Sequence, residues 1–118
     1  MTADAPAPWP DNRLAITGVV VDTPETRTSP GGVTVSQFTL EHGSEQPDGE
    51  ATRKTRFRVR VHVRGKALQA SAVGLQPGDP VRVFGHLGHT GYRPEQQRLV
   101  IIARRIQPEP HQETQGVE

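Results

Sequence analysis

The chain has 118 residues, of which 14 are Lys or Arg and 13 are Asp or Glu, so its formal net charge is only +1. This length has room for one domain. The absence of cysteine excludes a disulfide framework, a thiolate metal site and a thiol nucleophile. Twelve Gly and eleven Pro disfavour a helical bundle, because both residues weaken helix interiors.

The ends of the chain are rich in Pro, Ala, Gln and Glu. The first residues, MTADAPAPWP, lack the basic start and apolar stretch of a secretion signal, and no later segment is apolar enough to span a membrane. We therefore expect a cytoplasmic protein without membrane contact. The lack of apolar periodicity at 1–11 and 108–118 predicts disordered tails on either side of one folded domain at 12–107.

The small net charge conceals a segregation of charge along the chain. Residues 1–52 carry a net charge of −6, residues 53–105 carry +10, and residues 106–118 carry −3. Charges more than about 10 Å apart are screened at 0.1 M salt, so the central block behaves locally as a polycation. Such a run is usually a solvated surface, and a surface for nucleic acid is the alternative.

The residue pattern predicts an all-β chain with one short helix. Strands are expected at 13–24, 33–42, 54–64, 80–87 and 98–106, and the helix at 65–73. Gly18 is expected to bend the first strand, and the run from Leu99 to Ala103 indicates a last strand covered on both faces. Turns or loops are expected at 25–32, 43–53 and 88–97, the second of them mobile. Three strands, a helix and two strands, in this order, are the layout of the five-stranded OB-fold barrel, with the helix between strands 3 and 4.

The strand at 54–64, KTRFRVRVHVR, alternates between apolar and cationic residues. Its apolar face includes Phe57, which we expect in the core together with Phe38. Its other face carries Arg56, Arg58, Arg60, His62 and Arg64. Like charges about 7 Å apart on one face repel one another. They favour a bound polyanion or, alternatively, carboxylates such as Glu41 and Glu45 on the neighbouring strand or loop. The candidate nucleic-acid-binding residues of this region are Arg53, Lys54, Arg56, Arg58 and Arg60.

Aromatic and basic residues also lie together near the loop at 88–97. Tyr92 beside Arg93 and Arg98 suits a splayed base next to its phosphate, because bases stack on aromatic rings. Packing over the loop is the alternative for Tyr92. Phe84 is a candidate for a second stacking platform. Trp9, in the N-terminal tail, is a candidate contact for a base or another subunit, or has no contact.

The five histidines do not form a metal or catalytic motif. His86 and His89 lie three residues apart, but no close pair of carboxylates completes a site. The sequence contains no HExxH, no GxSxG and no phosphate-binding loop of the Walker type. We therefore expect neither enzyme activity nor a metal or cofactor.

The sequence resembles the primosomal replication protein N (PriB) family, dimeric relatives of the bacterial single-stranded DNA-binding protein. The matching segments, in order, are NRLAITG, SPGG, QFTLEHGS, VHVRG and GDPVRVFGHL, followed by Ala103 and Ile106. The resemblance implies an OB-fold homodimer without catalytic activity. It also implies binding of single-stranded DNA and a part in the restart of stalled replication forks, with the PriA helicase and other primosome proteins as partners.

The resemblance assigns roles to individual residues. Basic positions in the family's first-hairpin and last-hairpin loops carry over to Arg27, Arg93 and Arg98. Arg56 stands where the family has a stacking Trp, Ala51 where it has a Phe, and Gly43 where it has a basic residue. This chain is therefore expected to exchange stacking for charge, with a steep salt dependence and little base preference.

Two other functions fit the same pattern. One is a general single-stranded DNA-binding protein that coats strands. The end of the chain, PEPHQETQGVE, lacks the acidic cluster and terminal Phe with which such proteins commonly dock partners. The other is an OB-fold adaptor that mainly binds another protein, with binding of DNA or RNA incidental.

Overall fold

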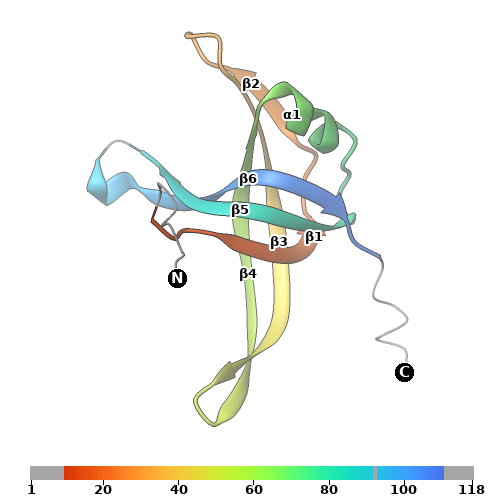
Figure 1. Ribbon diagram of the computed structural model, residues 1–118, viewed down its shortest axis with the longest axis vertical. Helices are drawn as coiled ribbons and strands as arrows, with labels where there is room; N and C mark the ends of the chain where they lie inside the picture. The colour runs from red at the N-terminus through yellow and green to blue at the C-terminus, as the bar shows by residue number, and fades with distance from the viewer. Residues whose placement is uncertain (1–9, 92, 111–118) are drawn as a thin grey trace, which may run out of the picture.

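The computed structural model describes residues 10–91 and 93–110. Its elements, in chain order, are β1 (Leu14–Val20), β2 (Glu25–Thr28), β3 (Thr34–Asp48), β4 (Ala51–Arg64), α1 (Lys66–Val73), β5 (Pro80–Thr90), the 3-10 turn η1 (Pro94–Gln96) and β6 (Arg98–Pro108). Figure 1 shows the strands crossing one another, with α1 at one end of the crossing. Most of both expected tails lies outside the described residues.

The strands form one closed sheet. Hydrogen bonding runs in the order β1-β5-β6-β4-β3-β2, and β1 also pairs with β3 through Val19 and Val20, which closes the barrel. β1 and β2 are two halves of one strand interrupted at 21–24, so five strands make the wall. All pairs are antiparallel except β4 with β6. The predicted five-stranded OB-fold barrel, with a short helix after its third strand, is confirmed.

Gly18 lies where β1 passes from its pairing with β5 to its pairing with β3. A Cβ atom at this position would lie 2.5 Å from the backbone oxygen of Glu41 and 2.8 Å from the Leu40 side chain. Atoms do not approach so closely, so the two strands can cross here only because residue 18 has no side chain. The bend expected at Gly18 is a close crossing of two strands.

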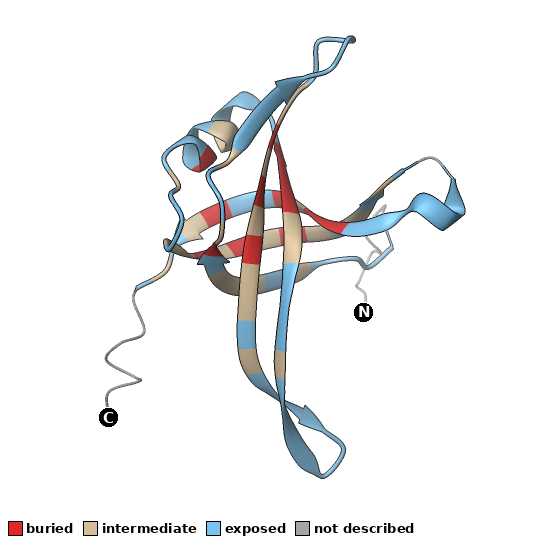
Figure 2. Cartoon of the chain, turned by 180° about the vertical axis from the view of Figure 1, so that it is seen from behind, coloured by how far each residue is buried: buried red, intermediate tan, exposed pale blue. Residues whose placement is uncertain are grey.

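The core fills the centre of the barrel, where Figure 2 shows the buried residues gathered on the crossing strands. Its largest fully buried side chains are those of Phe38, Leu40, Ile101, Val20, Val61, Val63, Val81 and Val83. The prediction of Phe38 as a core residue is confirmed, and burying such a side chain contributes about 1.5 to 3 kcal/mol. α1 covers one end of this core with Ala72 and Leu68.

Outside the β3–β4 hairpin, strands extend further than predicted at three places. The predicted turn at 25–32 is wrong for its first half, because Glu25–Thr28 pairs with β3 as strand β2. β2 contacts β3 through hydroxyl groups instead of buried apolar side chains, with Thr26 Oγ1 2.9 Å from Ser36 Oγ. Its sequence therefore has no apolar alternation from which a strand could be predicted. β5 continues to Thr90 and β6 to Pro108.

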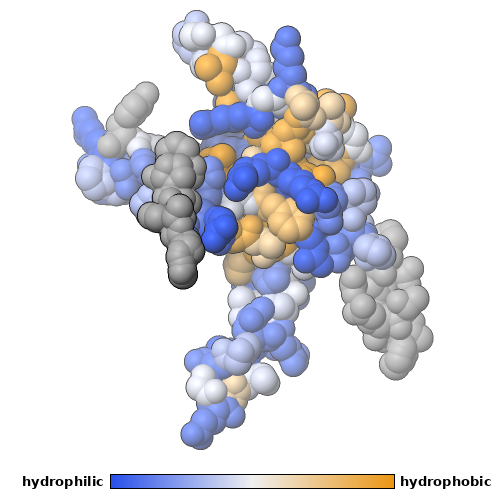
Figure 3. Space-filling model, viewed as in Figure 1, coloured by the Kyte–Doolittle hydropathy of each residue, from blue (hydrophilic) through white to orange (hydrophobic). Residues whose placement is uncertain are grey.

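The predicted mobile loop at 43–53 is a β-hairpin instead. β3 runs to Asp48 and β4 begins at Ala51, with Gly49 in the turn at a φ of +66° that favours glycine. Opposite charges face one another across it, Glu45 opposite Lys54, and Arg53 donates to Asp48. Figure 1 shows this hairpin projecting from the barrel, and Figure 3 shows it mostly hydrophilic. Both its faces are in water, so the sequence has no apolar alternation to reveal it.

Two apolar residues predicted to be covered are exposed. Phe57 is 41% exposed and Leu99 is 68% exposed. Phe57 pairs with His42, beyond the buried Leu40, and Leu99 is the second residue of β6, before the buried Val100, so both lie outside the core. In the rest of the predicted run, Val100, Ile101 and Ala103 are buried.

Candidate nucleic-acid interface

The arginines of β4 lie beside acidic residues of β3. Glu41 is the register partner of Arg58, two residues from Arg56 in β4. Its Oε2 accepts hydrogen bonds from Arg56 Nε at 3.0 Å and Nη2 at 2.8 Å, and its Oε1 accepts one from Arg58 Nε at 3.0 Å. Hydrogen bonds from Arg56 and then Arg58 hold the pKa of Glu41 below its ordinary value. One carboxylate therefore partly neutralises two cations.

Arg60 is held more firmly than its neighbours on β4. Its Nη1 donates to Asp22 Oδ2 at 3.2 Å and to Thr39 Oγ1 at 2.8 Å, and its Nη2 donates to Gln37 Oε1 at 3.0 Å. The side chain is only 37% exposed. These contacts fix the direction of the guanidinium and leave part of it in water.

The alternative of pairing with carboxylates is thus realised for all four candidate arginines of the hairpin and strand. Arg53 contacts Asp48, Arg56 and Arg58 share Glu41, and Arg60 contacts Asp22. Ion pairs between exposed side chains contribute little, with a median of about 0 to 1 kcal/mol, so phosphates can compete for the same arginines. Lys54 has no carboxylate within salt-bridge distance in the described part of the chain.

A groove of about 390 Å³ brings cations of two strands together. Arg58, Arg60 and His62 of β4 line one side, and Arg98 and Leu99 of β6 line the other. We call it the cationic groove. Arg98 is exposed and contacts no carboxylate among the described residues, so its charge is uncompensated. Two elements far apart in sequence thus present guanidiniums to one cavity.

A second groove, of about 700 Å³, joins the cationic groove at Arg58. The segment Val19–Val21 forms an apolar side. The side on the hairpin is lined by Lys54, Arg56 and Arg58 together with the carboxylates of Glu41 and Glu45. Val19 is 43% exposed. The apolar side and the three cations fit a polymer with flat, apolar base faces and an anionic backbone, which has to compete with the two carboxylates.

His62 does not contribute a positive charge to this surface, contrary to its predicted place on a cationic face. It is 7% exposed, and in register it lies between Gln37 of β3 and Ile102 of β6. Burial lowers the pKa of His62, and the charges of Arg64 and Arg60 lower it further. The imidazole is a neutral part of the groove floor.

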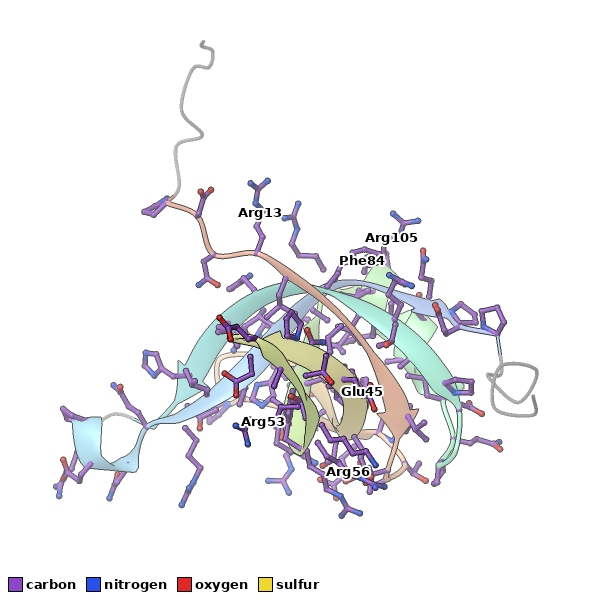
Figure 4. All side chains as sticks on the ribbon, turned by 90° about the horizontal axis from the view of Figure 1, so that it is seen from below. Arg13, Glu45, Arg53, Arg56, Phe84 and Arg105 are labelled. Atoms are coloured by element: carbon purple, nitrogen blue, oxygen red, sulfur yellow. The ribbon has the colours of Figure 1, made fainter. Side chains whose placement is uncertain are left out.

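The remaining candidates lie apart from the cationic groove. Arg27, on β2, is 75% exposed beside Glu25 at 3.5 Å, and Arg93 is exposed immediately before η1. Figure 4 shows Phe84 on the opposite side of the molecule from Arg56. Tyr92 lies outside the described residues.

Sequence reasoning missed two exposed apolar residues beside these cations. Leu99 lines the cationic groove next to Arg98. Phe57 follows Arg56 and lies against His42, with ring centroids 5.2 Å apart at 37°. Their position in the sequence could have indicated this exposure, because each stands next to a polar loop or hairpin rather than in the middle of an apolar run.

Two features are absent from the described residues. No group of three or more His, Asp or Glu residues in 10–91 and 93–110 is placed to hold a metal ion. None of the helices in the described chain has the length and apolar character needed to cross a membrane.

Sequence comparisons place the chain among known proteins. The model of a family described as another single-strand binding protein family matches residues 12–104. Replication restart protein PriB of Serratia proteamaculans (strain 568) is 35% identical over 96 residues, which cover 81% of this chain and 91% of that protein. The protein of the same name from Proteus mirabilis (strain HI4320) is 32% identical over 96 residues, with the same coverage.

Solved structures share the fold. PriB from Ralstonia solanacearum aligns with a TM-score of 0.72 at 19% identity, covering 86% of this chain and 100% of that one. The Plasmodium falciparum SSB in complex with single-stranded DNA aligns with a TM-score of 0.66 at 22% identity, covering 82% of this chain and 90% of that one. At these identities the likeness concerns the barrel itself.

Proposed function

The chain belongs to the single-strand binding protein family and is related to replication restart protein PriB, and from this premise we propose that it binds single-stranded DNA in replication restart. The family model covers 12–104, which includes both grooves. The binding role follows from chemistry of this chain's own residues, as well as from its relatives.

The cationic groove is the observation that carries the proposal. Arg58 and Arg60 from β4 and Arg98 from β6 line one cavity. Guanidiniums bind phosphate oxygens, often through two hydrogen bonds, and the adjoining Leu99 and Val19 offer apolar contact to bases. Because three guanidiniums line this groove and phosphates carry no sequence information, the groove suits contact with the backbone and little sequence preference.

The finer parts of the role concern partners. We propose the PriA helicase and other primosome proteins as partners, supported by the relatives named replication restart protein. This role belongs in the cytoplasm. A homodimer is supported by β1, since residues 14–18 of this strand pair with β5 on one side and with no other strand of the described chain. An edge of this kind can pair with a second copy.

The test is a titration of labelled oligo-dT and oligo-U at two salt concentrations, with particle mass recorded. If Z phosphates are neutralised, log K falls with log salt at a slope of roughly −0.7Z. Removing two groove cations, R58A/R98A, should weaken binding and flatten that slope. K66E is the matched control, because it also lowers the net charge by two and Lys66 lies exposed on α1, outside both grooves.

An affinity that is the same at both salt concentrations contradicts the proposal. The role in restart needs its own measurement, namely binding to purified PriA helicase before and after nuclease treatment, together with unwinding of a forked substrate. A contact that survives nuclease with no change in unwinding favours the adaptor function. DNA binding without any helicase contact favours a general strand-coating protein.

A further inference from the structure

β6 exposes two consecutive arginines, Arg104 and Arg105, between the buried residues Ala103 and Ile106. In a regular strand, consecutive side chains point to opposite faces, so one of the two arginines would face the core. The register with β5 explains the exception. Ala103 pairs with Gly85 and Arg105 pairs with the preceding β5 residue, so Arg104 is the extra residue of a β-bulge.

Gly85 makes the bulge possible. A Cβ atom at this position would lie 2.0 Å from the backbone oxygen of Ile102 and 2.9 Å from its carbonyl carbon. No side chain larger than hydrogen fits this approach of β5 to β6. The exposure of both Arg104 and Arg105 therefore follows from the packing of β5 against β6 and does not depend on the conformation of a loop.

An aromatic ring lies beside the bulge. Phe84 is paired with Ala15 of β1 on one side and with Arg105 of β6 on the other. Directly paired residues share a face of the sheet, so the three side chains form a row on the outside of the barrel. The Arg105 guanidinium carbon lies 5.3 Å from the centroid of the Phe84 ring. Ala15 is small and exposed, so no large β1 side chain stands opposite the ring.

The two arginines of the bulge carry uncompensated charge. In the described part of the chain, neither Arg104 nor Arg105 has a carboxylate within salt-bridge distance. Arg82, two residues before Phe84 on β5, differs because Glu109 holds it at 3.1 Å. We call Phe84, Arg104 and Arg105 the bulge surface.

The bulge surface lies on the opposite side of the molecule from the arginines of the hairpin. Figure 4 shows Phe84 and Arg105 on one side of the molecule, with Arg13 projecting on the same side, and Arg53 and Arg56 on the opposite side. β6 links the two regions, because Arg98 at its start lines the cationic groove and the bulge lies near its end.

We propose that the bulge surface is a second contact surface for single-stranded nucleic acid, reached by a strand that leaves the cationic groove and continues around the barrel. The inference rests on the proposed function. Its occupant follows from charge and shape: uncompensated guanidiniums bind phosphates, and an aromatic ring flanked by a guanidinium stacks a base. A second copy of the chain seated on this surface, unlike one paired with the edge of β1, fits poorly, because a two-fold contact sets the same positive patch against itself.

The test compares a short and a long oligo-dT. A strand of about 8 nucleotides lies within the roughly 4 to 16 that one OB fold covers, and a strand of about 30 is long enough to leave the groove. For R104A/R105A with the long strand, the slope of log K against log salt should become shallower by about 1.4. Each lost phosphate contact reduces the magnitude of the slope by roughly 0.7. With the short strand the variant should match the wild type. F84L, which keeps an apolar side chain, should weaken only long-strand binding, by about five-fold or more.

K66E is again the control, because it matches the double variant in net charge and leaves the bulge surface intact. An unchanged slope for R104A/R105A with the long strand overturns the inference. Equal losses with both strands also overturn it, because they place the arginines on the path of the short strand. A change in particle mass without a change in DNA binding overturns it in favour of self-association. Failure of the wild type to bind the short strand is a separate result that refutes the proposed function.

Discussion

Glu41 and Arg56 form an ion pair in which one carboxylate oxygen of Glu41 accepts two hydrogen bonds, from Arg56 Nε at 3.0 Å and from Arg56 Nη2 at 2.8 Å. The second oxygen of the same carboxylate binds Arg58. Glu41 therefore occupies the donors that the proposed function assigns to phosphates. DNA that contacts Arg56 or Arg58 competes with a negative charge already in place.

Removal of that charge should strengthen DNA binding. We expect Glu41→Gln to raise the affinity for oligo-dT several-fold at low salt, and to steepen the salt slope by about 0.7 if one further phosphate contact forms. The measurement is a fluorescence anisotropy titration across a range of salt. Glu50→Gln is the control, since Glu50 lies exposed in the turn of the same hairpin, lines neither groove and contacts neither arginine. Weaker binding by Glu41→Gln would show that Glu41 mainly positions the arginines.

The same ion pair predicts an effect of acid on stability. Hydrogen bonds from Arg56 and Arg58 hold the pKa of Glu41 below the ordinary 4.5. A carboxyl group whose pKa is lower in the folded state stabilises the fold above its unfolded pKa, and this contribution is lost as pH falls through the folded pKa. The difference in Tm between wild type and Glu41→Gln should therefore be constant near neutral pH and shrink below about pH 4.5. It should also be small, because both arginines are exposed. Thermal unfolding at a series of pH values measures it, and a difference that persists in acid contradicts it.

His62 should make stability depend on pH in a higher range. Burial, with the charges of Arg64 and Arg60, lowers its pKa from the ordinary 6.5. As pH falls, the unfolded chain takes up the proton first, so the stability from neutral His62 is complete above about pH 6.5 and is lost towards the lower folded pKa. His62→Gln keeps a polar side chain that does not titrate. Its Tm should change less than that of the wild type between pH 7.5 and about pH 5, and parallel curves would contradict this.

The sequence predicts the barrel well because its core obeys simple alternation. Val61 and Val63 are buried where the third strand was predicted to face inward, and the helix follows at 66–73. It predicts the hairpin at 43–53 poorly, because both faces of that hairpin are in water and its pairing rests on cross-strand charges such as Glu45 opposite Lys54. Periodicity reports burial and carries no information about polar pairing.

In the candidate site, too, alternation predicts which residues share a face of a strand but not which polar groups they contact. The cationic face of β4 follows from alternation, but its carboxylate partners do not, since Asp22 is 38 residues from Arg60 in the chain. The bulge at Arg104 escaped prediction because a strand with one extra residue keeps an apolar run on each side of it. Two adjacent arginines between buried residues are nevertheless a usable sign of such a bulge.

Gly85 offers the sharpest test of the bulge itself. An added methyl group would lie 2.0 Å from the Ile102 backbone oxygen, and backbone atoms of two paired strands cannot simply move aside. We expect Gly85→Ala to lower the free energy of unfolding by about 1 to 3 kcal/mol or more, measured by urea unfolding with the slope m checked for constancy. Gly43→Ala is the control, because a Cβ there meets no atom within 4 Å, and it should change stability by about 0.5 kcal/mol or less. Equal stabilities of the two variants would mean that β5 and β6 separate at residue 85 at little cost, and the bulge would then not be a fixed feature of the barrel.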